Sequence, residues 1–589
     1  GAGITAINTQ TGVETKTTAN NVGIYSFPSL QPGVYNIVAV VDGFQKSTKT
    51  DVKLGMAAQI RLNFEMAVAG TATEVEVATT AESMILDAGS STGNVMQEEL
   101  VSELPLVSND VMDLLNTMGG VVKAEDPIFA AHSQTFAGVS SGNINIQRDG
   151  VSVNEVRYTS GIVSPNRINQ EMVGEFKMVL SPVDAEMGRG AGQVQIMTKS
   201  GSNAFHGSGV WNIQNTALDA REFEAKRMNE TPSWRNLNNY TISASGPIIR
   251  NKTFFFASWD QQLVRSKAWL TVSALTNCAR KGIYRYYPGV VSINAADNTN
   301  YAANPYPHEQ AVVSLTDGTP LRPASATGDL MYQSVFGPLD ATALAQIAAD
   351  PVECSQYTAP GIGNAAPGVT GLFFAPNQGL DQTGYVSKYL TLLPEANYYG
   401  YGDGLNTAGY KWWRTTSGIN NIFGTGEDNR RKSITVKIDH NINNAHRLSG
   451  TYTLEKNVGE DGGRVWPENS YIGETWRRPQ SLTASLTSTV SPTLLNEFRF
   501  GFSRLTGIRM SSRDTAPQLD PILNDLMSDV PLPNYDVSHG PIVYSYDALS
   551  FGPGTSAQIG GVSSPYSSRG IMNSTWGGTD HRWTFADTV

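Results

Sequence analysis

The residues best suited to acid–base chemistry lie in one short segment, VDAEMGRGAG, which contains Asp184, Glu186 and Arg189. Two carboxylates and a guanidinium this close together can share a proton or hold an anion. The segment is also rich in glycine, but its glycines alternate and lack the GxGxxG spacing that cradles a dinucleotide. We therefore interpret the three charged residues as a structural polar network and expect no catalytic centre.

Metal and thiol chemistry have little more support. His132 and His206 have no partners at metal-ligand spacing, so we predict no metal site and no cofactor. The only two cysteines, Cys278 and Cys354, lie in the same irregular region. We expect them to form a disulfide, as in proteins of an oxidising compartment. The sequence thus predicts a protein that is not an enzyme.

The composition limits the class of protein further. A chain of 589 residues is long enough for two or three domains, and only 16% of its residues are charged, against roughly 25% in soluble domains. No run of about 18 apolar residues is present, which excludes a helical membrane span but not a β-barrel. The net charge of -11 argues against nucleic acid as a partner.

Strict alternation of apolar and polar residues dominates the chain after residue 206. In SITVKIDH, for example, three aliphatic residues alternate with Thr435, Lys437 and Asp439, which are too polar for lipid but suit a hydrated lumen. Alternation predicts eight strands, near residues 207–214, 237–246, 252–263, 432–440, 446–456, 480–490, 494–506 and 579–589. Their connections are long and short in turn, the longest covering about 264–431. This regularity is typical of an outer-membrane β-barrel.

The first 206 residues show a different pattern. Residues 1–70 are short β-rich runs separated by turn signals, and we expect the strand over 34–41 to be buried on both faces. The stretch SNDVMDLLNTMGG predicts a helix with an apolar stripe, which Ser108, Asn109 or Asp110 can cap. Further on, Asp149-Gly150 predicts a tight turn between two strands.

Several of these segments resemble a known family. LPLVSNDVMDLLNTMGGV, INIQRDGVSVNE and EFKMVLSPVDAEMGRGAGQVQIMTKSGSNAFHGS resemble the plug and first barrel strand of TonB-dependent outer-membrane receptors, in particular the Oar-like branch. The resemblance implies a mainly β chain located in the outer membrane of a Gram-negative bacterium. It divides the chain into a carboxypeptidase-regulatory-like, transthyretin-type β-sandwich in the periplasm (1–70), a linker (71–82), an α+β plug (83–206) and the N-terminal part of a large antiparallel transmembrane β-barrel (207–589).

The resemblance also implies a function. In the family, an external ligand binds the loops and the plug, and TonB, energised by an inner-membrane complex, pulls on the plug to open a path. Glu74, Val75, Glu76 and Val77 resemble the TonB box, which offers an extended strand to TonB. An ordinary linker strand or the last strand of the sandwich would show the same pattern. The ligand is unidentified, and the remaining partner expected is outer-membrane lipid.

Two alternatives remain at this point: a SusC-like glycan importer that works with a surface lipoprotein, and a structural or adhesive surface protein. The long connection is rich in aromatic residues that could bind ligand or simply order the loop (Tyr284, Tyr286, Tyr287, Trp412 and Trp413). We also expect further strands beyond Val589. Eight strands enclose too little space for a plug, and a sheet in lipid cannot leave an edge unpaired.

Overall fold

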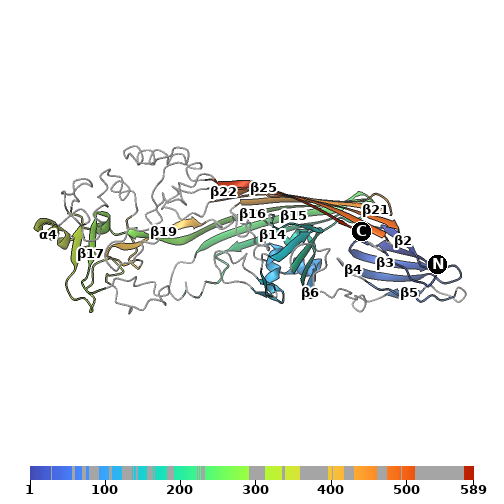
Figure 1. The fold of residues 1–589 in the computed structure, drawn as a ribbon, viewed down its shortest axis with the longest axis horizontal. Helices are drawn as coiled ribbons and strands as arrows, with labels where there is room; N and C mark the ends of the chain where they lie inside the picture. The colour runs from blue at the N-terminus through green and yellow to red at the C-terminus, as the bar shows by residue number, and fades with distance from the viewer. Residues whose placement is uncertain are drawn as a thin grey trace.

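The strands of the computed structural model form five separate sheets in the part of the chain that it describes (Figure 1). No helix in that part is long and apolar enough to cross a membrane. The residues left undescribed are 28–29, 56–59, 69–74, 79–91, 105, 107–108, 123–134, 137, 141–142, 155–163, 165, 182–191, 222, 224–225, 227–232, 291–311, 335–338, 358–394, 401, 417–429, 461–473, 492–493 and 511–575.

The first sheet, here called the N-terminal sheet, has the strand order β2-β1-β3-β4-β5. Its strands are β1 (Gly3–Asn8), β2 (Glu14–Thr18), β3 (Gly33–Val40), β4 (Ser47–Leu54) and β5 (Val75–Ala78). One face carries the core, in which Tyr35 and Ile37 pack with Leu62. The expectation that β3 is buried on both faces is wrong, because Val40 on its other face is 51% exposed.

The plug is built around a second five-stranded sheet, of order β11-β10-β13-β12-β6. Its strands are β6 (Thr92–Gln97), β10 (Ile144–Arg148), β11 (Val151–Ser152), β12 (Val173–Ser181) and β13 (Gly192–Thr198). The strands β7 (Val121–Val122), β8 (Thr135–Phe136) and β9 (Val139–Ser140) form a small separate sheet. With the helix α1 (Glu98–Glu103) and the 3₁₀ helices η2 (Val111–Thr117) and η4 (Gln170–Met172), the larger sheet encloses an apolar core.

The helix expected near residue 110 is present as η2, but it is a 3₁₀ helix of seven residues. Asp110 caps it, since its carboxylate accepts a hydrogen bond of 3.1 Å from the backbone N–H of Met112. Leu114 and Leu115 are fully buried, as their stripe predicted. Most 3₁₀ segments are no longer than three or four residues, so η2 is unusually long for its type.

The Asp149-Gly150 turn is confirmed. Asp149 has φ 49° and Gly150 has φ 78°, and they connect β10 to the antiparallel β11. Positive φ at both central residues is the signature of a type I′ hairpin turn, for which Asp-Gly is a preferred pair.

The largest sheet has ten strands and contains all eight strands predicted from alternation. These are β14 (His206–Asn215), β15 (Trp234–Ile249), β16 (Thr253–Leu275), β20 (Arg430–Asn441), β21 (His446–Glu460), β23 (Gln480–Ser491), β24 (Leu494–Met510) and β25 (Trp576–Thr588). We call it the barrel sheet. Neighbouring strands pair antiparallel, and the short turns gather at one end of the sheet, the long connections at the other.

The long third connection is more regular than the sequence indicated. The strand expected to end near residue 263 continues to Leu275, because β19 (Thr407–Thr416) returns along its outer half in a ten-residue ladder. The short β22 (Glu474–Arg477) extends the same end of the sheet. Beyond β16 the chain forms α3 (Asn277–Arg280), β17 (Ile283–Tyr286), β18 (Met331–Ser334) and α4 (Ala341–Ala349).

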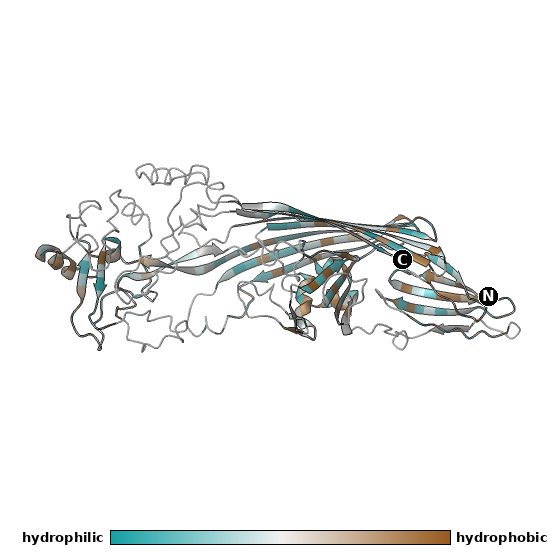
Figure 2. Cartoon of the chain, in the orientation of Figure 1, coloured by the Kyte–Doolittle hydropathy of each residue, from teal (hydrophilic) through white to brown (hydrophobic). Residues whose placement is uncertain are grey.

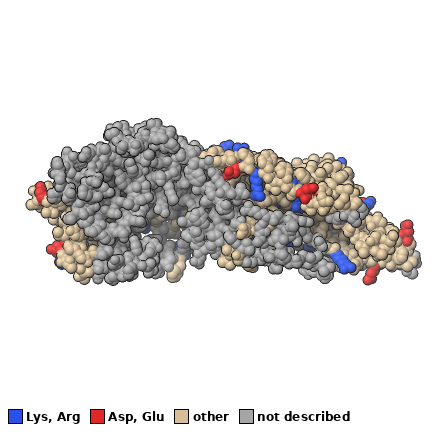
Figure 3. All heavy atoms as spheres, viewed as in Figure 1, with Lys and Arg blue, Asp and Glu red and all other residues tan. Residues whose placement is uncertain are grey.

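The two faces of the barrel sheet have opposite polarity, visible as alternating colours along its strands in Figure 2. Apolar side chains on one face are exposed, as at Ile434 (48%) and Phe585 (67%). Polar side chains on the other are buried, including Thr451, Glu455 and Lys437. On the face seen in Figure 3, the described strands show few charged groups in a mostly uncharged surface. Apolar outside and polar inside is the arrangement of a barrel in lipid.

A charge on the outer face tests this orientation. Ile434→Arg is expected to destabilise the protein folded in lipid vesicles by up to about 2–4 kcal/mol, because a guanidinium that faces hydrocarbon loses its hydration. The urea midpoint of unfolding from vesicles measures the effect. The control Ile434→Val should cost less than about 1 kcal/mol. Equal midpoints for the two variants would show that this face does not meet lipid.

Candidate functional site

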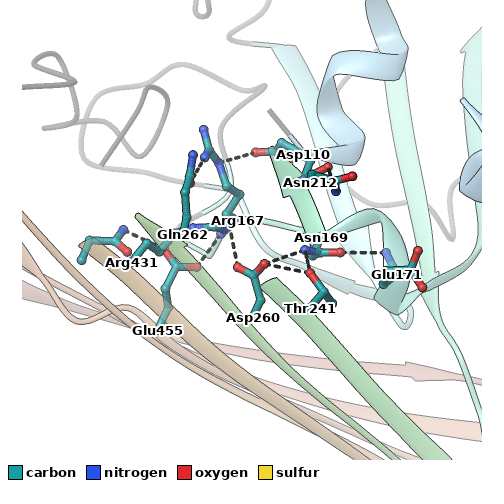
Figure 4. A network of polar contacts seen from close by, with 12 residues as sticks. Asp110, Arg167, Asn169, Glu171, Asn212, Thr241, Asp260, Gln262, Arg431 and Glu455 are labelled. Atoms are coloured by element: carbon teal, nitrogen blue, oxygen red, sulfur yellow. Dashed lines mark hydrogen bonds and ion pairs between the residues drawn. The ribbon is translucent and has the colours of Figure 1, made fainter. Parts of the chain in front are cut away.

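One contact between the plug and the barrel sheet is made by a short segment, residues 166–172, which has side chains on two sides. Ile168 and Met172 point into the plug core and are 0% and 3% exposed. Between them, Asn169 caps η4 by accepting a 2.8 Å hydrogen bond from the backbone N–H of Glu171. The segment therefore has a fixed backbone, from which the side chains of Arg167 and Asn169 reach the barrel strands (Figure 4).

Arg167 connects three elements. Its backbone N–H donates to Glu455 Oε2 on β21 at 2.8 Å, and its Nη1 donates to Gln262 Oε1 on β16 at 2.8 Å. Its Nε lies 3.4 Å from Oδ2 of Asp110, the residue that caps η2. The same residue thus fixes the plug helix and both barrel strands, with only 6% of its side chain exposed.

Asn169 makes the neighbouring contact with the barrel. Its Nδ2 donates to Asp260 Oδ2 at 2.8 Å and to Thr241 Oγ1 at 3.1 Å. Thr241 and Asp260 are register partners on β15 and β16, and the threonine hydroxyl also donates to the carboxylate at 3.2 Å. The other carboxylate oxygen of Asp260 lies 2.6 Å from Nη2 of Arg431, and both side chains are at least 96% buried. We call the whole set the plug–barrel network (Asp110, Arg167, Asn169, Thr241, Asp260, Gln262, Arg431 and Glu455).

A second contact lies nearer the short-turn end of the sheet. Lys437 Nζ on β20 donates to the carbonyl of Thr198 at 2.8 Å and lies 3.6 Å from Asp149 Oδ1. Asp149, in the plug's hairpin turn, in turn accepts from the backbone N–H and the hydroxyl of Thr198 at 2.9 and 2.8 Å. Beside it, the guanidinium of Arg148 donates to the hydroxyl of Ser481 on β23. Both contacts consist of charges and hydrogen bonds.

The two plug carboxylates have different electrostatic environments. Burial raises the pKa of Asp110 to about 6, and the nearby charge of Arg167 only partly opposes this. Burial alone would also raise the pKa of Asp149, but the charge of Lys437 and the two Thr198 donors hold it below its usual range. Asp149 is therefore a fixed charge, whereas Asp110 titrates close to neutral pH.

Beyond the barrel sheet, the long third connection is held together by a disulfide and a buried arginine. Cys278 Sγ and Cys354 Sγ are 1.99 Å apart. Arg285 is 1% exposed, and its Nε donates to the carbonyl of Leu405 at 3.0 Å. Of the five aromatic residues that could either bind ligand or order the loop, Tyr287 and Trp412 are buried and contribute to packing. The other three, Tyr284, Tyr286 and Trp413, are partly exposed.

Several residues singled out in the sequence lie outside the described part of the chain: Glu74, Ser108, His132, Asp184, Glu186 and Arg189. Val75, Glu76 and Val77 lie in β5, the last strand of the N-terminal sheet. His206 begins β14 and is exposed. No group of three or more metal-ligating side chains is found among the residues that the structure describes.

The residues of the plug–barrel network were not identified from the sequence, apart from Asp110 as one of three candidate helix caps. Their hydrogen bonds span large separations along the chain, 95 residues from Arg167 to Gln262 and 288 from Arg167 to Glu455. One signal was present: Asp260 and Arg431 are charged residues at inward positions of alternating strands. A charged side chain at an inward position needs a hydrogen-bonding or ion-pair partner, but the neighbouring sequence does not identify that partner.

Comparison with known proteins gives two family matches. A model described as an outer membrane beta barrel domain matches residues 197–326 and 325–582, and one described as a carboxypeptidase regulatory-like domain matches residues 1–67. Among curated proteins, the chain is similar to the TonB-dependent transporter Oar of Myxococcus xanthus. The two are 24% identical over 269 residues, which is 43% of this chain and 24% of that protein. The matched region thus spans about a quarter of this relative's length.

Solved structures similar to this chain include the outer membrane transporter YddB of Escherichia coli, with 9% sequence identity and a TM-score of 0.36. That match covers 71% of this chain and 39% of YddB. A mutant of the ferric enterobactin receptor PfeA of Pseudomonas aeruginosa is 12% identical with a TM-score of 0.35, over 71% of this chain and 41% of the receptor.

Removing Arg167 tests how firmly the network seats the plug. Arg167→Gln leaves Asp110 buried without its ion pair, which is expected to destabilise the seated plug by about 3–5 kcal/mol. Hydrogen exchange of the β10 amides in the full chain measures the loss. The control is Arg322→Gln, which removes an exposed ion pair with Asp329 and should change little. Similar protection in both variants would contradict a seating role for Arg167.

The raised pKa of Asp110 predicts a pH dependence. Because its pKa is higher in the folded state than its usual 3.8, Asp110 contributes stability that is fully present below pH 3.8 and is lost as the pH rises through about 6. The contribution is about 3 kcal/mol at most. Asp110→Asn keeps a cap for η2 but cannot titrate, so the difference in β10 protection between wild type and variant should change between pH 4 and 7. A difference that stays constant over this range would refute the assignment.

Proposed function

Because the outer membrane beta barrel model matches well over half of its residues, the chain belongs to the outer-membrane β-barrel family, and we propose that it works as a TonB-dependent transporter. Its location is the outer membrane of a Gram-negative bacterium. An external ligand binds on the side of the long connections, and TonB, energised by an inner-membrane complex, pulls from the periplasm. The plug then moves and opens a path along the polar face of the barrel sheet.

The observation that carries this proposal is the polar nature of the contact between plug and barrel. An apolar interface exposes hydrophobic surface when it opens, whereas hydrogen-bonded groups in a hydrated lumen exchange one partner for water. The net cost of each such exchange is only about 0.5–1.5 kcal/mol, although ion pairs cost more. The apolar core of the plug lies mostly within the plug itself, and Phe256 is its one member from a described barrel strand. The contact thus holds the plug in place at rest, and its hydrogen bonds can be replaced by bonds to water when TonB pulls.

The coupling segment of this proposal is residues 74–77. Extended chain with alternating valines suits strand addition, in which the backbone supplies the hydrogen bonds. It overlaps β5, the last strand of the N-terminal sheet, and precedes the plug in the chain, so a pull on it can reach the plug through the connecting chain. Residues 1–70 then form a periplasmic domain that precedes the coupling segment.

Proline at Val77 tests the coupling role. Val77→Pro removes a backbone donor and is expected to weaken binding of the purified periplasmic domain of TonB to the full receptor by tenfold or more. Val77→Ala keeps the backbone N–H and so loses no backbone hydrogen bond to TonB. Its affinity for the TonB domain should stay within about twofold of wild type. Isothermal titration measures both. If the proline variant binds as tightly as the alanine variant, the coupling segment lies elsewhere.

A further inference from the structure

The segment assigned to TonB coupling is already part of a sheet. β5 pairs in parallel with β4, in a ladder that runs from Ser47↔Val75 to Thr50↔Ala78. It is the last strand in the order β2-β1-β3-β4-β5, and β4 is its single partner among the described strands. One edge of β5 is therefore paired with β4, and its other edge is the outer edge of the described sheet.

The other side of the same sheet is attached to the barrel. Asn203, in the chain between plug and barrel, donates from its backbone N–H to the carbonyl of Gln10 at 3.0 Å and from Nδ2 to that of Thr11 at 2.5 Å. Asn203 also accepts a 2.9 Å hydrogen bond from the backbone N–H of Asn251, in the turn between β15 and β16. The contact is close: a Cβ on Gly12 would lie 2.6 Å from the side-chain oxygen of Asn251.

The two sides of the N-terminal sheet thus have different surroundings. The turn between β1 and β2 is seated on the short-turn end of the barrel, while β5 lies on the side of the sheet away from it (Figure 1). In a β-strand, the N–H and C=O groups of alternate residues point toward opposite edges. Those of β5 that point away from β4 have no partner strand among the described residues. Such an edge is a template for another extended chain.

We propose that a strand of TonB adds to this outer edge of β5 while β5 remains paired with β4, so that TonB and the N-terminal sheet form one continuous sheet. This rests on the coupling role proposed above for residues 74–77. Adding a strand at the outer edge keeps every hydrogen bond of the β4–β5 ladder, whereas stripping β5 from β4 would first break them all. The N-terminal sheet is then part of the docking surface for TonB, and its attachment through Asn203 holds that surface against the barrel.

A disulfide between β4 and β5 distinguishes the two ways of binding. Thr48 and Glu76 are register partners, about 4.8 Å apart at Cα in a parallel ladder, which is within the range that a disulfide spans. The double variant Thr48→Cys/Glu76→Cys in the full receptor fixes β5 on β4 when oxidised. The probe is the purified periplasmic domain of TonB, and the readout is its dissociation constant before and after reduction.

The expected result is that the oxidised and reduced forms of the double variant bind the TonB domain with dissociation constants within twofold of each other. A loss of tenfold or more on oxidation that reduction restores would overturn the proposal, because TonB would then require β5 to leave β4. A second cross-link, Ser47→Cys/Val75→Cys, lies at the next register pair and replaces the first if that variant does not fold. Glu76→Cys alone controls for the change in the coupling sequence.

The matched control is Thr5→Cys/Val38→Cys, which joins β1 to β3 in the same sheet without involving β5. It reports any effect of cross-linking or of reducing the native Cys278–Cys354 bond. Failure of wild type itself to bind the TonB domain is a different outcome, since it would remove the proposed function together with this inference. Binding by wild type that only the oxidised β4–β5 variant loses removes the inference alone.

Discussion

The polar inner face of the barrel sheet is the constraint on which the rest of this structure depends. A strand in lipid must present apolar side chains outward, and strict alternation then turns every second residue toward the interior. In this chain those residues include Asp260, Arg431, Lys437 and Glu455, which are almost fully buried. Buried charges are tolerated only when they are paired and hydrogen-bonded. Asp260 and Arg431 pair with each other, and the plug supplies further partners for Asp260, Lys437 and Glu455. The seating of the plug therefore depends on the alternation of the barrel strands.

The plug uses one set of residues for its own stability and another for its attachment to the barrel. Its apolar core lies between its sheet and its short helices and includes Ile168 and Met172. From the segment that contains these two residues, Arg167 and Asn169 reach the barrel strands with polar groups. A body with its own core can move or remodel without losing all its structure. A polar contact can also be replaced by water. An apolar core combined with a polar attachment suits the transport proposed above, in which the plug moves to open a path.

Attachment at the short-turn end follows a similar logic. Asn203 joins the β1–β2 turn of the N-terminal sheet to the turn that holds Asn251, so the sheet, the chain leading to β14 and the barrel meet at one amide side chain. At the opposite end, the long connection is closed by the disulfide and by Arg285, which bonds to backbone carbonyls. Both ends of the barrel sheet thus carry ordered structure, and backbone and amide groups around Asn203 help to hold it at the short-turn end.

The sequence by itself determined the features that arise from local chemistry. Alternation located eight strands of the barrel sheet to within a few residues, apart from the outer half of β16, because period two follows directly from the geometry of a strand. Asp149-Gly150 specified its turn, because a turn depends on the backbone of its own residues. The sequence also limited the cap of η2 to Ser108, Asn109 or Asp110, and the structure selected Asp110. Only the tertiary structure decided the partners of Arg167 and Asn169, the pairing of β19 with β16 and that of β5 with β4. Each of these contacts joins segments that lie far apart along the chain. Hydrophobic periodicity and turn residues describe only local structure, so they cannot predict which distant segment is the partner.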